Sequence, residues 1–134
     1  MSEPSPAYLI DTSWAIRHLR GRAEYTEKLS ALEPSGLAIS VITLAELYEG
    51  VARSSNRAGA ALDAFISGVR VLLVDEGTAR AFGKLSAQMR SAGNHPGDFD
   101  VTIAATAIQH GLTVLTTDVD DFSRFTDLKI ITAP

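Results

Sequence analysis

Four acidic residues that lie far apart in the chain have types and positions suited to a shared metal ion. Asp11 and Asp118 each follow a short stretch expected to be a strand. Glu46 lies in the first turn of one expected helix, and Asp100 opens another. If the strands are parallel, these helices begin at the edge of the sheet where the strands end. All four carboxylates are therefore expected to meet at that edge.

Carboxylates that meet in this way need a compensating charge. Two unit charges 4 Å apart repel by roughly 4 kcal/mol at an effective dielectric constant of about 20, and a bound divalent cation reverses that sign. Oxygen ligands without His or Cys suit Mg²⁺ or Mn²⁺. Such a metal can bind a phosphodiester, lower the pKa of a water and stabilise the departing oxygen. We expect Asp11, Asp100 and Asp118 to contact the metal directly or through water. Glu46 would orient a metal-bound water or complete a second metal site.

Each carboxylate also has a local explanation as a helix cap. Thr43 and Glu46 have the spacing of a capping box, in which the Glu side chain reaches back to a backbone N–H. Asp100 and Asp118 can cap the helices that follow them, and Asp11 can cap the turn after the first strand. Capping residues need not converge, so the expected convergence of all four acids favours the metal site.

Strands that alternate with helices must position these acids. Short apolar runs predict strands at 7–11, 37–41, 69–74, 112–116 and 128–131. Helical spacing and stop signals predict helices at 14–19, near 29–32, and at 43–53, 58–66, 77–92 and 101–110, with a short turn at 122–125. This alternation predicts an α/β fold with a mostly parallel sheet, in which the run 69–74 is buried on both faces. In such sheets, ligands bind beyond the carboxyl ends of the strands, where the strand order reverses.

The composition is that of one domain, which we expect residues 1–134 to form. The chain has 134 residues, of which 46% are hydrophobic and 21% charged, enough for a core without disulfides. It has no cysteine, and its histidines (His18, His95 and His110) lack metal-ligand spacing. The start does not have the pattern of a signal peptide, and no apolar run approaches the roughly 18 residues of a membrane span. We therefore expect a soluble cytoplasmic protein.

Four stretches, in this order, carry a family resemblance: Tyr8-Leu-Ile-Asp-Thr-Ser13, Ser40-Val-Ile-Thr-Leu-Ala-Glu-Leu-Tyr-Glu-Gly50, Asp100-Val-Thr-Ile-Ala-Ala-Thr-Ala107 and Leu115-Thr-Thr-Asp-Val-Asp-Asp-Phe122. With these motifs the chain resembles a PIN-domain ribonuclease, most closely the VapC toxins of bacterial toxin–antitoxin pairs. The resemblance implies a PIN-like three-layer α/β/α sandwich with a central sheet of four to five strands. It also implies a Mg²⁺- or Mn²⁺-dependent endoribonuclease and a homodimer. A small VapB-like antitoxin would neutralise it in a heterotetramer or larger complex.

Carried over by position, the resemblance assigns the family's four acidic positions to Asp11, Glu46, Asp100 and Asp118. The family often has Asn or Asp at the position of Asp118, so this chain has the more acidic option. We expect the substitution Asp11→Asn to abolish RNA cleavage while leaving the fold intact.

Other residues match positions around these acids. Thr12 and Thr116 match polar positions beside the site, where they would hold water or phosphate. Asp121 and Phe122 match a pair that follows the fourth acid, and we interpret Phe122 as a packing residue and Asp121 as a helix cap. Asp98 is interpreted as a solvated loop residue rather than a group that supports the site.

An RNA substrate needs basic residues to hold its backbone. Arg17, Arg20 and Arg22 cluster after the first strand and are either phosphate contacts or part of a solvated helix face. The net charge of −4 arises entirely in residues 98–134, which contain six acids and two bases. Without the four site acids the rest of the protein is neutral. We expect the metal-free protein to bind RNA poorly and the metal-loaded protein to bind it better.

Several apolar residues are candidates for contacts with RNA bases or with a protein partner. Trp14, Tyr48 and Phe99 could stack on bases, although the helical spacing of Trp14 and Tyr48 favours packing. The helical hairpin 43–66 is rich in apolar residues. These residues either bind a partner, which would be an antitoxin helix or a second subunit, or belong to the core.

Two rival functions remain. A phosphatase with an aspartyl nucleophile typically has two aspartates close after the first strand, but here Asp11 is followed by Thr12 and Ser13. The second rival is a PIN-like regulatory module that forms a DNA-binding complex with a partner without significant nuclease turnover. The intact acids argue against this module, and incubation with labelled RNA, with and without Mn²⁺ and EDTA, separates the alternatives.

Overall fold

The computed structural model of the chain describes residues 5–54 and 57–134. Within these residues, five strands form one sheet in which every pairing is parallel, in the order β3-β2-β1-β4-β5. The strands are β1 (Tyr8–Ile10), β2 (Leu37–Ser40), β3 (Arg70–Leu72), β4 (Thr113–Leu115) and β5 (Ile130–Ile131). The expected parallel α/β architecture is confirmed.

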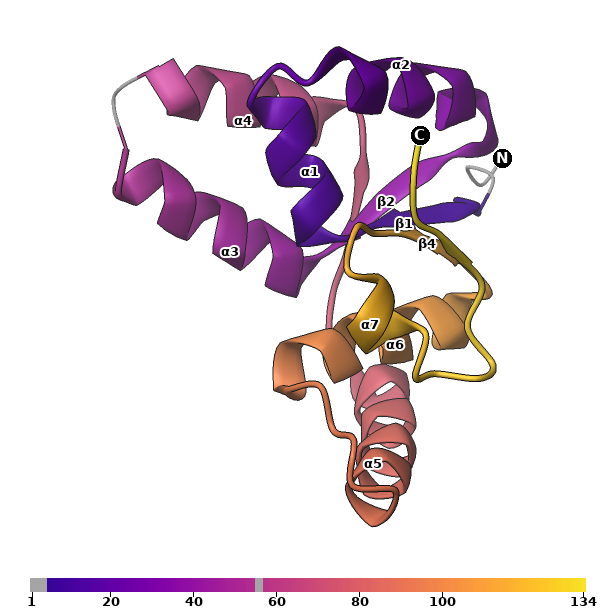
Figure 1. Cartoon of the computed structure of the whole chain (residues 1–134). Helices are drawn as coiled ribbons and strands as arrows, with labels where there is room; N and C mark the ends of the chain where they lie inside the picture. The colour runs from indigo at the N-terminus through magenta and orange to yellow at the C-terminus, as the bar shows by residue number, and fades with distance from the viewer. Residues whose placement is uncertain (1–4, 55–56) are drawn as a thin grey trace.

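Helices cover both faces of this sheet. They are α1 (Thr12–Leu19), α2 (Ala23–Leu32), the short 3₁₀ helix η1 (Glu33–Ser35), α3 (Val41–Ala52), α4 (Arg57–Ser67), α5 (Glu76–Ser91), α6 (Asp98–His110) and α7 (Val119–Phe122). Figure 1 shows α1 to α4 on one side of the strands and α5, α6 and α7 on the other. The molecule is thus the expected three-layer sandwich. None of the helices in the described ranges is long and apolar enough to cross a membrane.

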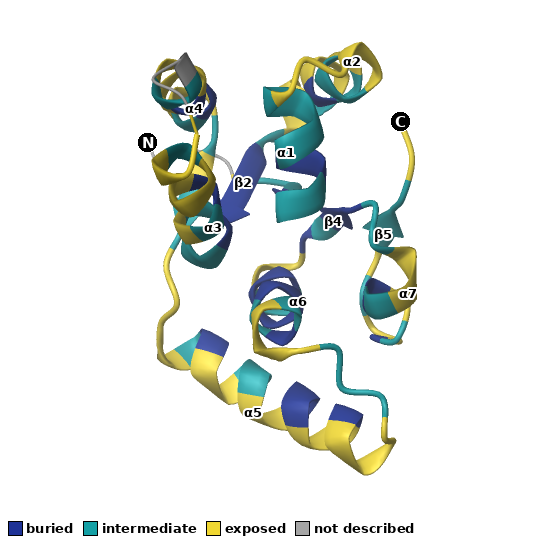
Figure 2. Ribbon diagram, turned by 60° about the vertical axis from the view of Figure 1, so that its left-hand side comes forward, coloured by how far each residue is buried: buried dark blue, intermediate teal, exposed yellow. Residues whose placement is uncertain are grey.

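Alternating strand residues connect the sheet to two separate cores. In β1, Leu9 packs with α5 and α6, whereas Ile10 packs with residues of α1 to α4. Val114 and Leu115 divide in the same way in β4. Successive side chains of a strand point to opposite faces, so short strands suffice to bury both faces. Helix α6 is buried along its middle and α5 exposes its outer face, as Figure 2 shows.

The strand order reverses between β1 and β4. The chain runs from β1 outward to β2 and β3, then returns through α5 and α6 to place β4 on the other side of β1. Asp11 directly follows β1, and the segment from Thr116 to Asp118 follows β4. The crevice at the carboxyl ends of β1 and β4 is therefore the place where a ligand is expected.

The run 69–74 does not form the strand expected from its composition. Only Arg70–Leu72 is extended as β3, and Leu73 and Val74 are 67% and 45% exposed. The expectation of burial on both faces was wrong because β3 is an edge strand, covered by a neighbour on one side only. Strand order, which depends on distant contacts, decided this burial.

Candidate metal centre

Three carboxylates converge beyond the strand ends. Asp100, Asp118 and Asp121 each offer a ligand atom, and these atoms all lie within 4.8 Å of one another. Asp100 stands in the first turn of α6, Asp118 precedes α7 and Asp121 belongs to α7. Because all three side chains are partly exposed, a bound ion would be open to a substrate.

Asp11 lies at the buried side of this cluster, with only 4% of its surface exposed. Its Oδ2 accepts hydrogen bonds from the hydroxyls of Ser13 and Thr116, both at 2.8 Å. The same two hydroxyls accept backbone N–H groups of Thr117 at 3.0 Å and Asp118 at 2.9 Å, respectively. These hydrogen bonds connect the residues that follow β1 with those that follow β4, and they hold Asp11 and Asp118 in place relative to each other.

Glu46 is not one of the three carboxylates that converge, but it is hydrogen-bonded to Thr12, the residue that directly follows Asp11. The Thr12 hydroxyl donates to Glu46 Oε1 at 2.8 Å and lies 3.1 Å from the hydroxyl of Thr43. This contact crosses from the start of α1 to α3, so Glu46 is held by a neighbouring element and not by its own helix. Thr12 and Thr116 thus both hydrogen-bond to carboxylates of the predicted site, and their contact with water or phosphate stays a prediction.

Burial and mutual repulsion perturb the acids of the cluster. Desolvation, the neighbouring Asp121 carboxyl and the charges of Asp11 and Asp118 together raise the pKa of Asp100 to about 7, and desolvation is the largest of these causes. Desolvation is also the largest cause that raises the pKa of Asp118, and the Asp121 carboxylate adds to it. Clustered carboxylates whose pKa values are raised by burial and by one another are typical of sites that bind a cation.

The capping interpretations had mixed outcomes. Asp118 caps α7, because its Oδ1 accepts from the backbone N–H of Asp121 at 3.3 Å. The Thr43–Glu46 capping box was wrong: α3 begins at Val41, and Ser40 caps it. Asp11 occupies the cap position of α1 but makes no capping hydrogen bond.

The structure revises the interpretation of Asp121 fully and that of Asp98 in part. Asp121 was interpreted as a cap, but Asp118 performs that role and the Asp121 carboxylate faces the cluster. Asp98 is exposed and lies in the first turn of α6, 3.7 Å from Arg90. It is as solvated as expected, although it belongs to a helix and not to a loop.

The three arginines after β1 differ in their contacts. The guanidinium groups of Arg17 and Arg22 lie 5.8 Å and 5.6 Å from the centroid of the Tyr25 ring, and Arg22 also pairs with Glu24 at 2.7 Å. Arg20 is exposed and, with Glu46, lines a groove between α1, α3 and α4. Of the three, Arg20 is therefore the best placed to reach a substrate near the acids.

The aromatic residues divide between core and surface. Trp14 is completely buried and packs edge to face on Tyr25, as the packing interpretation predicts. Tyr48 is 50% exposed, so it does not belong to the core of this chain, and packing at an interface stays a prediction. Phe99, beside Asp100, is 54% exposed and is available to an unstacked base.

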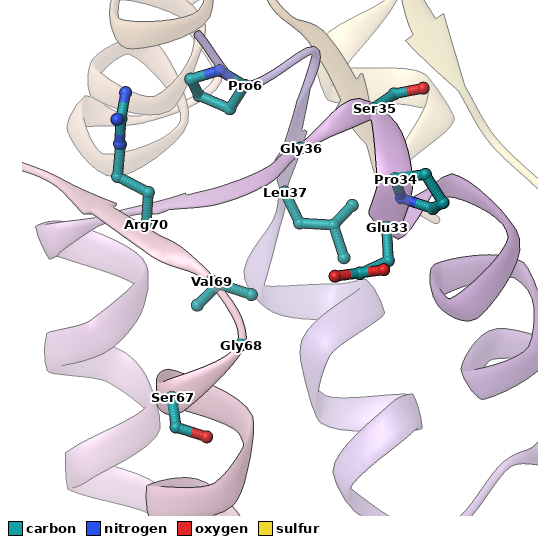
Figure 3. Close-up of a pocket in the computed structure, with 10 residues that line it drawn as sticks. All are labelled: Pro6, Glu33, Pro34, Ser35, Gly36, Leu37, Ser67, Gly68, Val69 and Arg70. Atoms are coloured by element: carbon teal, nitrogen blue, oxygen red, sulfur yellow. The ribbon is translucent and has the colours of Figure 1, made fainter. Parts of the chain in front are cut away.

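A well-formed hollow lies away from the acidic centre. It has a volume of about 510 Å³ and is lined by residues at the beginnings of β2 and β3, including Leu37, Arg70 and Glu33 (Figure 3). Since the strands are parallel, this hollow lies at the amino edge of the sheet, opposite the strand ends that carry the acids. The chemistry of the carboxylates, not the depth of a cavity, identifies the functional site.

The family model of the PIN domain matches residues 8–128. The chain belongs to the PIN-domain family. It is 42% identical over 123 residues to ribonuclease VapC19 of Mycobacterium tuberculosis, covering 90% of this chain and 96% of that one. It is 31% identical over 125 residues to the tRNA(fMet)-specific endonuclease VapC of Salmonella typhimurium, covering 92% and 95%.

Solved structures lead to the same family. The crystal structure of VapBC2 from Rickettsia felis, bound to a DNA fragment from its promoter, contains a chain that superposes on this PIN domain with a TM-score of 0.88. The two chains are 26% identical, and the match covers 93% of this chain and 97% of the other. The whole described fold is thus that of a toxin-type PIN domain.

Proposed function

We propose that this PIN domain is a metal-dependent endoribonuclease that acts as the toxin of a VapBC-type pair. The observation that carries the proposal is the convergence of carboxylates from separate segments at the β1–β4 switch point, with ligand atoms within 4.8 Å. The relatives named ribonuclease and endonuclease, which match nearly the whole chain, support the reaction class. In this proposal residues 1–134 form one catalytic unit.

The donor set fits Mg²⁺ or Mn²⁺. Asp11, Asp100 and Asp118 provide only oxygen ligands, which these cations prefer, and the raised pKa values of Asp100 and Asp118 identify a place where positive charge is favourable. The bound metal supplies an activated water and stabilises the departing oxygen of the phosphodiester. Glu46, held at Oε1 by Thr12, orients the attacking water and accepts its proton.

In this proposal, exposed basic and aromatic side chains around the acidic centre bind the RNA. Arg20 supplies a phosphate contact beside Glu46, and Phe99 offers an exposed ring beside Asp100. Arg17 and Arg22 form a second, weaker phosphate surface around Tyr25. The acidic centre itself would repel RNA until a cation occupies it.

The antitoxin would occupy the groove between α1, α3 and α4. This groove has a volume of about 280 Å³ and combines apolar residues such as Leu19 and Val51 with Arg20 and Glu46. An amphipathic helix fits such a surface, and its end would reach the acidic centre. Solved neighbours of the chain are toxin–antitoxin complexes, which supports a small protein partner and assembly as a dimer or larger complex.

The ribonuclease proposal is tested by incubating the purified protein with labelled transfer, ribosomal and messenger RNAs, with Mn²⁺ or with EDTA. We expect cleavage only with metal, and none by the Asp11→Asn variant. Asp120→Asn is the matched control, because Asp120 is an exposed acid outside the cluster. Metal-independent cleavage, or a folded Asp11→Asn protein that cleaves at the wild-type rate, would reject the proposal.

The antitoxin groove is tested separately by co-expression with the neighbouring gene product and sizing of the complex. Ala61→Glu places a charge in the groove, whereas Ala60→Glu places the same charge on an exposed position outside it. We expect only Ala61→Glu to prevent the complex. Equal effects of the two variants would exclude this groove.

A second candidate is a regulatory module that binds DNA with its partner and has no significant turnover. The DNA-bound neighbours favour a DNA-binding complex. Under this alternative, the complex binds promoter DNA while the isolated chain leaves every RNA of the panel intact with Mn²⁺ present.

A further inference from the structure

His95 lies in the short segment between α5 and α6, and both nitrogens of its ring make a hydrogen bond. Its Nδ1 accepts the backbone N–H of Gly97 at 3.1 Å, and its Nε2 lies 2.9 Å from the hydroxyl of Ser86 in α5. A backbone N–H can only donate, so Nδ1 carries no proton and Nε2 donates to the Ser86 hydroxyl. The His95 side chain is 13% exposed, and Ser86 is buried. The neutral His95 ring thus connects α5 to the residue that precedes α6.

Gly97 is the N-cap residue of α6, and its backbone N–H is the group that His95 binds. In a capping box, the N–H of the N-cap residue is accepted by the side chain at the third position of the helix. In α6 this third position belongs to Asp100, since the helix begins at Asp98. A carboxylate in the first turn is also attracted by the positive end of the helix dipole. The Gly97 N–H is therefore a local partner that would draw the Asp100 carboxylate away from Asp118.

The neighbouring helix α5 contains such a capping box. Its N-cap residue is Asp75, and the Asp75 N–H donates to the hydroxyl of Thr78, the residue at the third position, at 3.2 Å. In α6 the corresponding N–H donates to His95 instead, and the Asp100 carboxylate lies in the 4.8 Å cluster. The two helices thus differ in the residue that accepts the N–H of the N-cap residue.

We propose that His95 is a positioning residue, which accepts the Gly97 N–H in place of Asp100 and so leaves the Asp100 carboxylate available to the metal centre. The inference rests on the proposed function, because it takes Asp100 as a metal ligand. Ser86 holds the ring in the orientation that directs Nδ1 to Gly97. Because the imidazole is neutral, it satisfies the N–H without adding a charge beside the acids.

The first test compares two amides at position 95 by Mn²⁺ binding without RNA, measured from the electron paramagnetic resonance of the unbound ion. His95→Asn retains an acceptor close to the place of Nδ1, whereas His95→Gln moves its amide toward Ser86 and loses that acceptor. We expect His95→Gln to weaken Mn²⁺ binding about 10-fold and His95→Asn to weaken it no more than about 2-fold. Equal losses in the two variants would overturn the positioning role.

His110→Gln is the matched control, because His110 is an exposed histidine at the other end of α6. It should leave the Mn²⁺ affinity unchanged. Circular dichroism of each variant shows whether the compared proteins are folded. A measurement on the wild-type protein needs no variant: nitrogen NMR should detect a scalar coupling across the hydrogen bond between the Gly97 N–H and His95 Nδ1. Absence of this coupling would also overturn the proposal.

A second test needs no metal and follows the competition between His95 and Asp100 for the Gly97 N–H. His95→Gln is introduced into the wild-type chain and into the Asp100→Ala chain, and urea unfolding is measured in EDTA. We expect a larger fall in the urea midpoint in the Asp100→Ala chain, because no carboxylate can then take the place of His95. Equal falls in the two chains would show that Asp100 does not compete for this N–H.

These outcomes separate the inference from the proposed function. If the wild-type protein binds no Mn²⁺, the proposed function fails, and the unfolding experiment still decides whether His95 and Asp100 compete. If it binds Mn²⁺ and Asp11→Asn abolishes binding while His95→Gln does not weaken it, the metal centre stands and the role of His95 is overturned.

Discussion

Neutralising Asp100 is expected to stabilise the metal-free protein while destroying its site. In the folded chain, desolvation and neighbouring acids raise the pKa of Asp100 from 3.8 to about 7. The folded state therefore binds more protons than the unfolded state between about pH 4 and pH 7. Stability from this group is fully present below about pH 4 and is lost as the pH rises through 7. The substitution Asp100→Asn removes that loss.

The size of the effect follows from the pKa difference and the position of the side chain. A rise from 3.8 to about 7 corresponds to an upper limit of about 4 kcal/mol above pH 7. Asp100 is roughly half buried, so solvent screening reduces this to about 2 kcal/mol. A carboxylate in the first turn of a helix gains about 0.3–1 kcal/mol, which the Asn variant forgoes. We expect a net gain of about 1–1.5 kcal/mol at pH 8.

Urea unfolding in EDTA measures this gain, with the fluorescence of the buried Trp14 as the signal. The comparison is made at pH 8 and pH 5, and the gain should be smaller at pH 5. Asp98→Asn is the matched control, because Asp98 lies in the same helical turn but is exposed beside Arg90. It should change the unfolding free energy by no more than about 0.5 kcal/mol. A destabilised Asp100→Asn protein, or a gain that is the same at both pH values, would refute the reasoning.

Three further predictions concern the Thr12–Glu46 contact, Mn²⁺ binding and the packing of α5. Thr12→Val removes the hydroxyl that holds Glu46 and should lower the cleavage rate about 10-fold, whereas Thr12→Ser should retain most of it; equal rates for both variants would contradict this role. Mn²⁺ at 100 times its Kd should raise the unfolding free energy by about 2.7 kcal/mol in thermal melts, and EDTA should reverse the increase. Gly77→Ala should lower the unfolding free energy by about 1 kcal/mol, because its Cβ would displace the Gln109 Nε2 that donates to Asp75. Gly83→Ala, where a Cβ meets nothing within 4 Å, should instead be neutral or stabilising, and similar losses at both positions would show that the displacement is unimportant.

The sequence was sufficient to predict the sheet, most of the helices and the proximity of Asp100 and Asp118, but the structure does not bring Glu46 into the same cluster. Each strand is a short apolar run, and a parallel sheet directs Asp11 and Asp118 to one edge by rule. The helix boundaries were less accurate: α6 begins at Asp98, three residues before the expected start, because Asp98 and Asp100 suit a first turn.

The errors share a physical cause, which is competition from distant residues. Thr43 and Glu46 have the spacing of a capping box, but Thr12, 31 and 34 residues away, contacts both side chains instead. Asp118 both caps α7 and lies with Asp121 beside Asp100, a proximity that depends on the position of α6. Ser13 was overlooked as a site residue, although its place two residues after Asp11 allowed the hydrogen bond that the structure contains.

The most direct test of the metal-dependent mechanism measures binding and cleavage on the same sample. Mn²⁺ is titrated into metal-free protein with a labelled RNA that it cleaves, while free Mn²⁺ and the cleaved fraction are recorded together. We predict that cleavage rises in parallel with Mn²⁺ occupancy and that both disappear in Asp11→Asn. Cleavage that persists in a variant with no bound Mn²⁺ would contradict it.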